Sequence, residues 1–458
     1  MGPGATASFS LNATGVTDPL RVPEGPGEVS APARALRPGT TGEGVAWLTM
    51  SAPGTSWSSA SDTSVVVEVS VDGGPAQSVV LFYGARTFTY TGFTGPSSVG
   101  AHTLSVHVDD ALSHTASAPT VDIVAVHLGV VPESDPDYFE EAYAPVIYGR
   151  SSAASMYMPL LVDATDSVAS DGVHSLEYVL VVSAHDQGDS VVPAYQWAVW
   201  GRMTDIVTVV DESVAPDGSV LSATYASCGC ESIPDFPDSL MAPQETTADI
   251  PASDYDGHHP VLRDASATNY LSDSGTTPFR FQQAPVAAPP AGQLRDEVMD
   301  ANPWTYDISN EEMPREQVIS TNPDDLLVGD YRQYAIVDSD IDEHGAQDVQ
   351  FEIQLAGDPV WYSSDYRQMT AGVPSTFPFN DGGHTRTVVK LPVDWASRPI
   401  VGLRIRLDVS PGSPPASATI GSLEVLDVTD RWRVVARKLP STVTIYSATS
   451  LEPVDVPS

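Results

Sequence analysis

Six residues that could carry acid–base or metal chemistry lie in the middle of the 458-residue chain: His185, Asp186, Asp189, Arg202, Asp205 and His259. The first three follow an apolar run, 179–182, on a segment where side chains can converge on a ligand. Carboxylates beside an imidazole suit a divalent cation or a division of acid and base roles. This set is therefore the candidate catalytic centre of a carbohydrate-active hydrolase or lyase. The alternative is an Arg202–Asp205 ion pair among solvated acids, with His259 packed before Pro260.

A second cluster consists of three acids at alternate positions, Asp338, Asp340 and Asp342. We expect them to end one strand and precede another. Glu343 occupies the place where a calcium-binding helix–loop–helix needs glycine, so that motif is excluded. Hard carboxylate oxygens still suit calcium, which is the one cofactor the sequence suggests. The alternative is a solvated acidic turn.

Five aromatic residues are candidates for stacking on the flat faces of sugars: Trp197, Trp200, Trp361, Tyr362 and Trp395. Aromatic residues also favour strands without any ligand, so packing in the core or at a strand edge is the alternative. The two cysteines, Cys228 and Cys230, flank a glycine, a spacing that strains a direct disulfide. With His258 and His259 they could complete a zinc site, or they are thiols or a strained bridge in an insertion.

Short runs of alternating apolar and polar residues predict strands along most of the chain. In 400–409, for example, Val401, Ile405 and Leu407 alternate with Arg404 and Arg406, which predicts one core face and one solvent face. No strand–helix–strand alternation or fixed repeat appears. The sequence therefore predicts an all-β fold of three consecutive β-sandwich-like domains.

The predicted domains are separated by segments rich in proline and polar residues. Residues 1–44, rich in Gly, Pro, Ser and Thr, are expected to form a disordered linker. An immunoglobulin-like sandwich should span 45–131, a central β domain with a long loop near 231–256 should span 132–290, and a jelly-roll-like sandwich should span 291–458.

Charge narrows the range of partners. The chain has 60 Asp and Glu against 21 Lys and Arg, a formal charge of -39. Such a surface repels phosphate backbones and anionic membranes, so we expect no nucleic acid. No apolar run approaches the roughly 20 residues that a membrane helix needs, so we expect no membrane insertion. Cationic ligands, metal ions and neutral glycans remain. The N-terminal residues lack a secretory signal, so either a leader was removed or the protein is cytosolic. We expect an extracellular or cell-surface protein.

Two stretches resemble known families. The sequences Tyr143-Ala-Pro145-Val-Ile-Tyr148, Thr204-Asp205-Ile and His258-His259-Pro260-Val resemble, in this order, the vacuolar-protein-sorting-62-like domain family over residues 139–275. The resemblance implies a β-sandwich and carries over Asp205 and His259, although the family has Gly-Asp-Trp-Glu where Thr204-Asp205-Ile stands. Residues 64–128, with Gly100-Ala-His-Thr-Leu-Ser-Val106, resemble a bacterial immunoglobulin-like module.

The sequence contains none of the local motifs of serine hydrolases, zinc proteases, Walker nucleotide-binding proteins or dinucleotide-binding enzymes. The leading interpretation is a secreted or surface β protein that binds an extracellular polymer, most plausibly a glycan, with calcium as a candidate ion. A hydrolase or lyase centred on the six residues above is the first alternative, and a structural envelope or assembly protein is the second.

Overall fold

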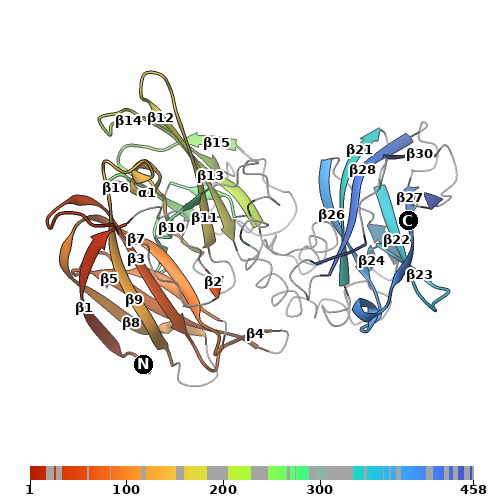
Figure 1. Ribbon diagram of the computed structural model, residues 1–458, viewed down its shortest axis with the longest axis horizontal. Helices are drawn as coiled ribbons and strands as arrows, with labels where there is room; N and C mark the ends of the chain where they lie inside the picture. Colours follow the sequence, from red (N-terminus) through yellow and green to blue (C-terminus); the bar gives the residue numbers. More distant parts are fainter. Residues whose placement is uncertain are drawn as a thin grey trace. The chain divides into compact units, whose positions relative to one another are not determined.

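The structure is a computed structural model in which most of the chain is β-strand (Figure 1). It describes residues 1–16, 25–26, 34–58, 61–82, 84–114, 120–150, 159–182, 205–227, 246–265, 269–273, 275–287, 298, 302, 334–344, 348–364, 366–370, 373–377, 383–408, 416–427, 433–436, 442–447 and 454–455. The predicted all-β class is confirmed. No helix within these ranges is long and apolar enough to span a membrane.

Contacts divide the chain into two compact units. Unit 1 comprises residues Met1–Gly188 and Thr204–Ile308, and unit 2 comprises Asp189–Met203 and Ser309–Ser458. The segments predicted as an immunoglobulin-like domain and as a central domain both belong to unit 1. Each unit is described by itself.

The first sheet of unit 1 contains nine strands: β1 (Thr6–Gly15), β2 (Gly25–Pro26), β3 (Thr41–Ser51), β4 (Ser56–Ser58), β5 (Ser61–Val71), β6 (Gln77–Leu81), β7 (Phe88–Ser98), β8 (Gly100–His114) and β9 (Asp122–Pro132). They follow the order β2-β7-β3-β9-β1-β8-β5-β4, with β6 paired to β5. Alternate residues such as Leu104, Val106 and Val108 are fully buried and supply the apolar core. The predicted turn between β5 and β6 is present, and Asp72 and Gly73 adopt φ of 51° and 73° there.

The expectation that residues 1–44 are disordered is wrong for their first strand. β1 pairs antiparallel with β8 from Thr6 to Ala13 and parallel with β9 at Thr14 and Gly15. Its apolar residues Ala7, Phe9, Leu11 and Ala13 alternate with polar ones, and ladder hydrogen bonds to β8 and then to β9 hold it as a strand. Ala13 and Val16 are buried at its end.

The second sheet of unit 1 follows the short helix α1 (Tyr138–Ala142). Its strands are β10 (Val146–Tyr148), β11 (Pro159–Val168), β12 (His174–Val182), β13 (Asp205–Val214), β14 (Val220–Ser227), β15 (Thr246–Asp249), β16 (Tyr255–Asp256), β17 (His259–Asp264), β18 (Leu271–Ser272), β19 (Arg280–Phe281) and β20 (Val286–Ala287). The order is β19-β10-β17-β18-β14-β13-β12-β11-β20, with β15 on β14 and β16 on β17. β15 and β16 lie in the segment predicted as a long loop.

Backbone hydrogen bonds join the two sheets of unit 1. The amide of Phe93 donates to the carbonyl of Gln282 at 3.0 Å, and the amide of Ala284 donates to the carbonyl of Thr91 at 3.0 Å. These bonds fix the middle of β7 against the segment around β19. The polar side chains described below lie at this junction.

Unit 2 is built from strands β21 (Tyr334–His344), β22 (Asp348–Leu355), β23 (Trp361–Ser363), β24 (Tyr366–Thr370), β25 (Val373–Phe377), β26 (Gly383–Lys390), β27 (Ile400–Asp408), β28 (Ala416–Asp427), β29 (Arg433–Ala436), β30 (Val443–Ser447) and β31 (Val454–Asp455), with the 3-10 helix η4 (Trp395–Ser397). One sheet has the order β26-β21-β28-β29, with β30 on β28; a second has the order β23-β22-β27-β31; β24 and β25 form a hairpin.

A single apolar cluster draws on both larger sheets of unit 2, which makes this unit a sandwich. In β27 the predicted core face is confirmed for Ile405 and Leu407, both at most 1% exposed. It is wrong for Val401, which is 58% exposed. Val401 lies at the start of the strand, next to the bulge where Leu355 pairs with Ile400, and the alternation is not maintained there.

Candidate functional site

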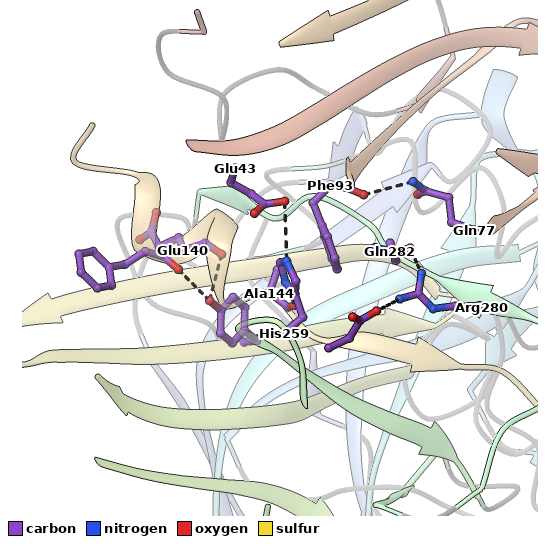
Figure 2. Close-up of polar contacts among 11 residues, drawn as sticks. Glu43, Gln77, Phe93, Glu140, Ala144, His259, Arg280 and Gln282 are labelled. Atoms are coloured by element: carbon purple, nitrogen blue, oxygen red, sulfur yellow. Dashed lines mark hydrogen bonds and ion pairs between the residues drawn. The ribbon is translucent and has the colours of Figure 1, made fainter. Parts of the chain in front are cut away.

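His259, from the predicted catalytic set, is buried at the junction of the two sheets of unit 1. It begins β17 and is 3% exposed. Its Nδ1 lies 2.8 Å from the carbonyl oxygen of Ala144, and its ring stacks on Phe93 with centroids 4.1 Å apart. Glu43 of β3 faces it, with 3.7 Å between Oε1 and Nε2 (Figure 2). The imidazole is therefore held in one orientation by a carbonyl, an aromatic face and a carboxylate.

His259 also lines a pocket of about 160 Å³ at the surface of this junction. The polar part of its wall comes from Gln77, Gln282, Arg280 and Asp256. Arg280 Nη2 lies 2.7 Å from Asp256 Oδ2, and its Nη1 donates to Gln282 (Figure 2). The charges of this wall are thus paired within the protein.

A second pocket, of about 380 Å³, adjoins the first. The two share Val71, Thr94 and Pro96 as wall residues, so together they form one depression, which we call the groove. Ten further residues line the groove, and most of them are small or carry a hydroxyl group: Thr41, Asp72, Gly74, Pro75, Gly95, Ser97, Ser98, His102, Gly257 and His259. Six of its side chains carry neutral hydroxyl or amide groups: Thr41, Gln77, Thr94, Ser97, Ser98 and Gln282.

A second cluster of polar side chains in unit 1 lies next to α1. Tyr178 of β12 donates from its hydroxyl to the carbonyl of Glu140 at 2.9 Å, and His174 Nδ1 lies 2.6 Å from Asp166 Oδ2. Burial, and then the charges of Asp137, Asp166 and Asp163, raise the pKa of Glu140 to about 8. Burial raises the pKa of Glu212 in β13 to about 8, although Tyr255 donates a hydrogen bond to it at 2.8 Å. Both carboxyls are therefore neutral in the folded protein below that pH.

Of the other members of the predicted catalytic set, Asp205 begins β13 and pairs with Val182 of β12. β18 and β14 lie between β13 and β17 in the sheet order, so Asp205 and His259 belong to strands that are not neighbours. The side chain of Asp205 lies outside the described residues, so its part in the catalytic hypothesis stays a prediction. His185, Asp186, Asp189 and Arg202 lie outside the described residues, so the catalytic hypothesis for them stays a prediction.

The three acids proposed for calcium lie within strand β21 and not in a turn after it. Asp338 is half-buried, Asp340 and Asp342 are exposed, and Ser339 and Ile341 between them are buried, so the acids share the solvent face. Ser422 of β28 donates to Asp340 Oδ2 at 2.7 Å. The described residues contain no group of three or more acidic, His or Cys side chains with the geometry of a metal site.

Calcium binding at this face stays a prediction that unfolding can test. Millimolar calcium should raise the midpoint of thermal unfolding beyond the increase that sodium chloride gives by screening the charge of -39. A ligand specific for the folded state stabilises by about 2.7 kcal/mol at a hundred times its dissociation constant. The double variant Asp340→Asn, Asp342→Asn should lose the calcium increment and keep the sodium chloride effect. An unchanged calcium increment in this variant would reject the site.

The aromatic candidates in unit 2 differ in their surroundings. Trp395 is 1% exposed in the core, so the expectation that it stacks on a ligand is wrong: the start of η4 turns it inward. Trp361 and Tyr362 are successive residues of β23 and point to opposite faces. Tyr362 packs on the core cluster and donates to Asp358 Oδ2 at 2.5 Å. Trp197, Trp200, Cys228 and Cys230 lie outside the described residues.

Trp361 lies on the polar face of the sheet, where its indole is already engaged. Cζ of Arg404 lies 3.6 Å from the centre of the indole ring. Arg404 pairs in register with Glu352 of β22, which is 4% exposed and also contacts Arg406. At least one face of this ring is thus occupied by a guanidinium group.

Sequence reasoning missed most of the groove. Thr41 of the groove and Glu43 beside His259 lie in the segment expected to be a disordered linker, and no sequence motif singles out Thr94 or Pro96. The signal available in the sequence was the run 45–50, Val-Ala-Trp-Leu-Thr-Met, which marks a buried strand whose start lies close to Glu43. Nothing in the sequence shows that this strand meets β17, more than two hundred residues away.

Comparisons with known proteins add little. No protein-family model matches the chain, and no curated protein matches it. Among solved structures, a viral chemokine binding protein, R17, encoded by rodent gammaherpesvirus Peru, aligns with 90% of this chain and 84% of its own at 8% identity and a TM-score of 0.13. Likeness at that level carries no argument about fold or function.

Proposed function

We propose that this protein is an extracellular or cell-surface binding protein that holds a neutral glycan chain in the groove of unit 1. The observation that carries the proposal is the groove itself, in which two pockets of about 160 and 380 Å³ share three wall residues. Two adjoining pockets suit several linked units of a polymer better than one small molecule.

The chemistry of the wall supports a neutral, hydroxylated ligand. Hydroxyl and amide side chains such as Thr41, Ser97 and Gln282 can each exchange hydrogen bonds with sugar hydroxyls. The charged side chains of the wall, such as Arg280 and Asp256, already pair with each other. The formal charge of -39 opposes binding of sulfated or uronic acid polymers.

A glycan array that contains neutral and acidic polysaccharides tests this function. We expect retention of one or more neutral glycans and none of the acidic ones. The variant Pro96→Trp places a large side chain on a residue shared by both pockets and should abolish the retention. Pro216→Trp, a matched change at an exposed proline of unit 1 outside the groove, should retain it. No binding by the parent protein, or equal binding by Pro96→Trp, would reject the proposal.

A further inference from the structure

One histidine of the groove makes two short hydrogen bonds to groups on opposite walls. His102 of β8 has Nδ1 2.7 Å from Asp72 Oδ2 and Nε2 2.7 Å from the carbonyl oxygen of Ser98. Asp72 lies in the turn between β5 and β6, and Ser98 ends β7. Asp72, Ser98 and His102 all line the larger pocket.

Both partners of this imidazole are acceptors. A carbonyl oxygen can only accept, so Nε2 must carry a proton. The pKa of Asp72 is lowered, first by the backbone amide of Thr103, which donates to Oδ1 at 2.8 Å, and then by His102, so Asp72 accepts as a carboxylate. Nδ1 must then carry a proton as well. A neutral imidazole has only one N–H and can keep only one of these two bonds.

The surroundings of His102 favour the doubly protonated form. Burial opposes protonation, but the hydrogen bonds to Asp72 and Ser98 outweigh it, so the pKa of His102 is raised. On β1 the residue paired with His102 is the apolar Leu11. Among the described residues, Asp72 is the titratable group that shifts His102, and it does so from the turn between β5 and β6.

We propose that doubly protonated His102 clamps the two walls of the groove together and makes ligand binding there depend on pH. Below the pKa of His102 the turn at Asp72 and the end of β7 are tied to one ring, and the larger pocket keeps its shape. As the pH rises through that pKa, one of the two bonds is lost and the ring no longer ties the turn at Asp72 to the end of β7. This regulation rests on the proposed function, because it acts on the groove assigned to the glycan.

The clamp can be measured without any ligand. Ring nitrogen resonances of His102 in a nitrogen-15 spectrum should show both nitrogens protonated at about pH 5.5 and one at about pH 8.5. Over the same pH range the protection of the Thr103 amide against hydrogen exchange should fall about fivefold, which is the change expected when roughly one hydrogen bond is lost. A His102 that is singly protonated throughout, or a Thr103 amide with unchanged protection, would overturn the clamp.

The effect on binding uses the glycan retained most strongly on the array. Its affinity should be about fivefold weaker at about pH 8.5 than at about pH 5.5. His102→Gln can make only one of the two bonds from its amide group, so it should bind weakly at both pH values. His107→Gln, on the same strand but beside Thr6 and away from the groove, should keep the parent profile.

The experiments can reject the proposed function and the proposed regulation independently of each other. A glycan bound equally well at both pH values would overturn the regulation and leave the proposed function standing. A clamp that titrates in a protein that retains no glycan would overturn the function and leave the clamp.

Discussion

Replacing Glu212 with Gln should make unit 1 more stable above neutral pH and remove part of the loss of stability that the parent shows as the pH rises. The folded-state pKa of Glu212 is raised to about 8 by burial, from an ordinary value of 4.5. Between these values the folded state holds a proton that the unfolded state has released. The free energy of unfolding therefore falls with rising pH, by about 1.4 kcal/mol per pH unit for one such group.

Glutamine imitates the protonated carboxyl without the need for a proton. Its amide oxygen can accept the hydrogen bond that Tyr255 donates to Glu212. At about pH 8 we expect Glu212→Gln to be more stable than the parent by about 2 to 4 kcal/mol, and at about pH 5 to differ little. Glu140→Gln should act in the same direction, since the pKa of Glu140 is also raised to about 8.

Urea unfolding at several pH values, with hydrogen exchange to assign the transition to unit 1, measures both effects. Glu133→Gln removes the same charge from an exposed position near α1 and should leave the slope against pH unchanged. If Glu212→Gln showed the slope of the parent, Glu212 would be ionised in the folded protein and its buried setting would have to be reconsidered.

The second large effect is expected in unit 2, where Glu352→Ala should destabilise by about 3 kcal/mol. Glu352 is 4% exposed, with Arg404 Nη2 2.7 Å from Oε2 and Arg406 Nη2 2.5 Å from Oε1. Removing the carboxylate leaves two guanidinium groups side by side. We place the effect at the lower end of the range for broken buried ion pairs because the arginine side chains are 22% and 29% exposed.

The double variant Glu352→Ala, Arg406→Met separates lost attraction from lost packing. It removes one of the two like charges, so it should recover part of the stability lost in Glu352→Ala. Calorimetry of the unit 2 transition is the measurement. If Glu352→Ala lowered the free energy of unfolding by less than about 0.5 kcal/mol, this cluster would contribute as little to stability as exposed ion pairs do.

The local alternation of apolar and polar residues was enough to predict the fold class. It was not enough where the position of a residue depends on contacts with distant parts of the chain. Leu104, Val106 and Val108 alternate in the sequence as they do in the core, because the two-residue period of a strand is a local property. β1 has the same two-residue period, with Ala7, Phe9, Leu11 and Ala13 at alternate positions, but it lies in a segment whose Gly, Pro, Ser and Thr content led to the prediction of a disordered linker. The inward position of Trp395 depends on η4, which the strand pattern could not reveal.

The candidate site was predictable only in part for the same reason. The burial and fixed orientation of His259 agree with the packed alternative stated for it, and its pocket is formed by residues of β7, β16, β19 and the turn after β5. No spacing rule joins Glu43 to His259 or Asp72 to His102, since each pair meets through sheet topology.

The position of β1 between β8 and β9 bears on how the chain folds during its synthesis. Thr6 and His107 face each other although they are 101 positions apart in the sequence, so β1 leaves the ribosome long before its partners exist. At a synthesis rate of about 5 to 20 residues per second, the strand waits on the order of 5 to 20 seconds with both edges unpaired. In β1 five polar residues alternate with apolar ones, of which only Phe9 and Leu11 are large, and this composition keeps a waiting segment soluble. The polar composition that led to the prediction of disorder is thus the composition that lets β1 wait without aggregating.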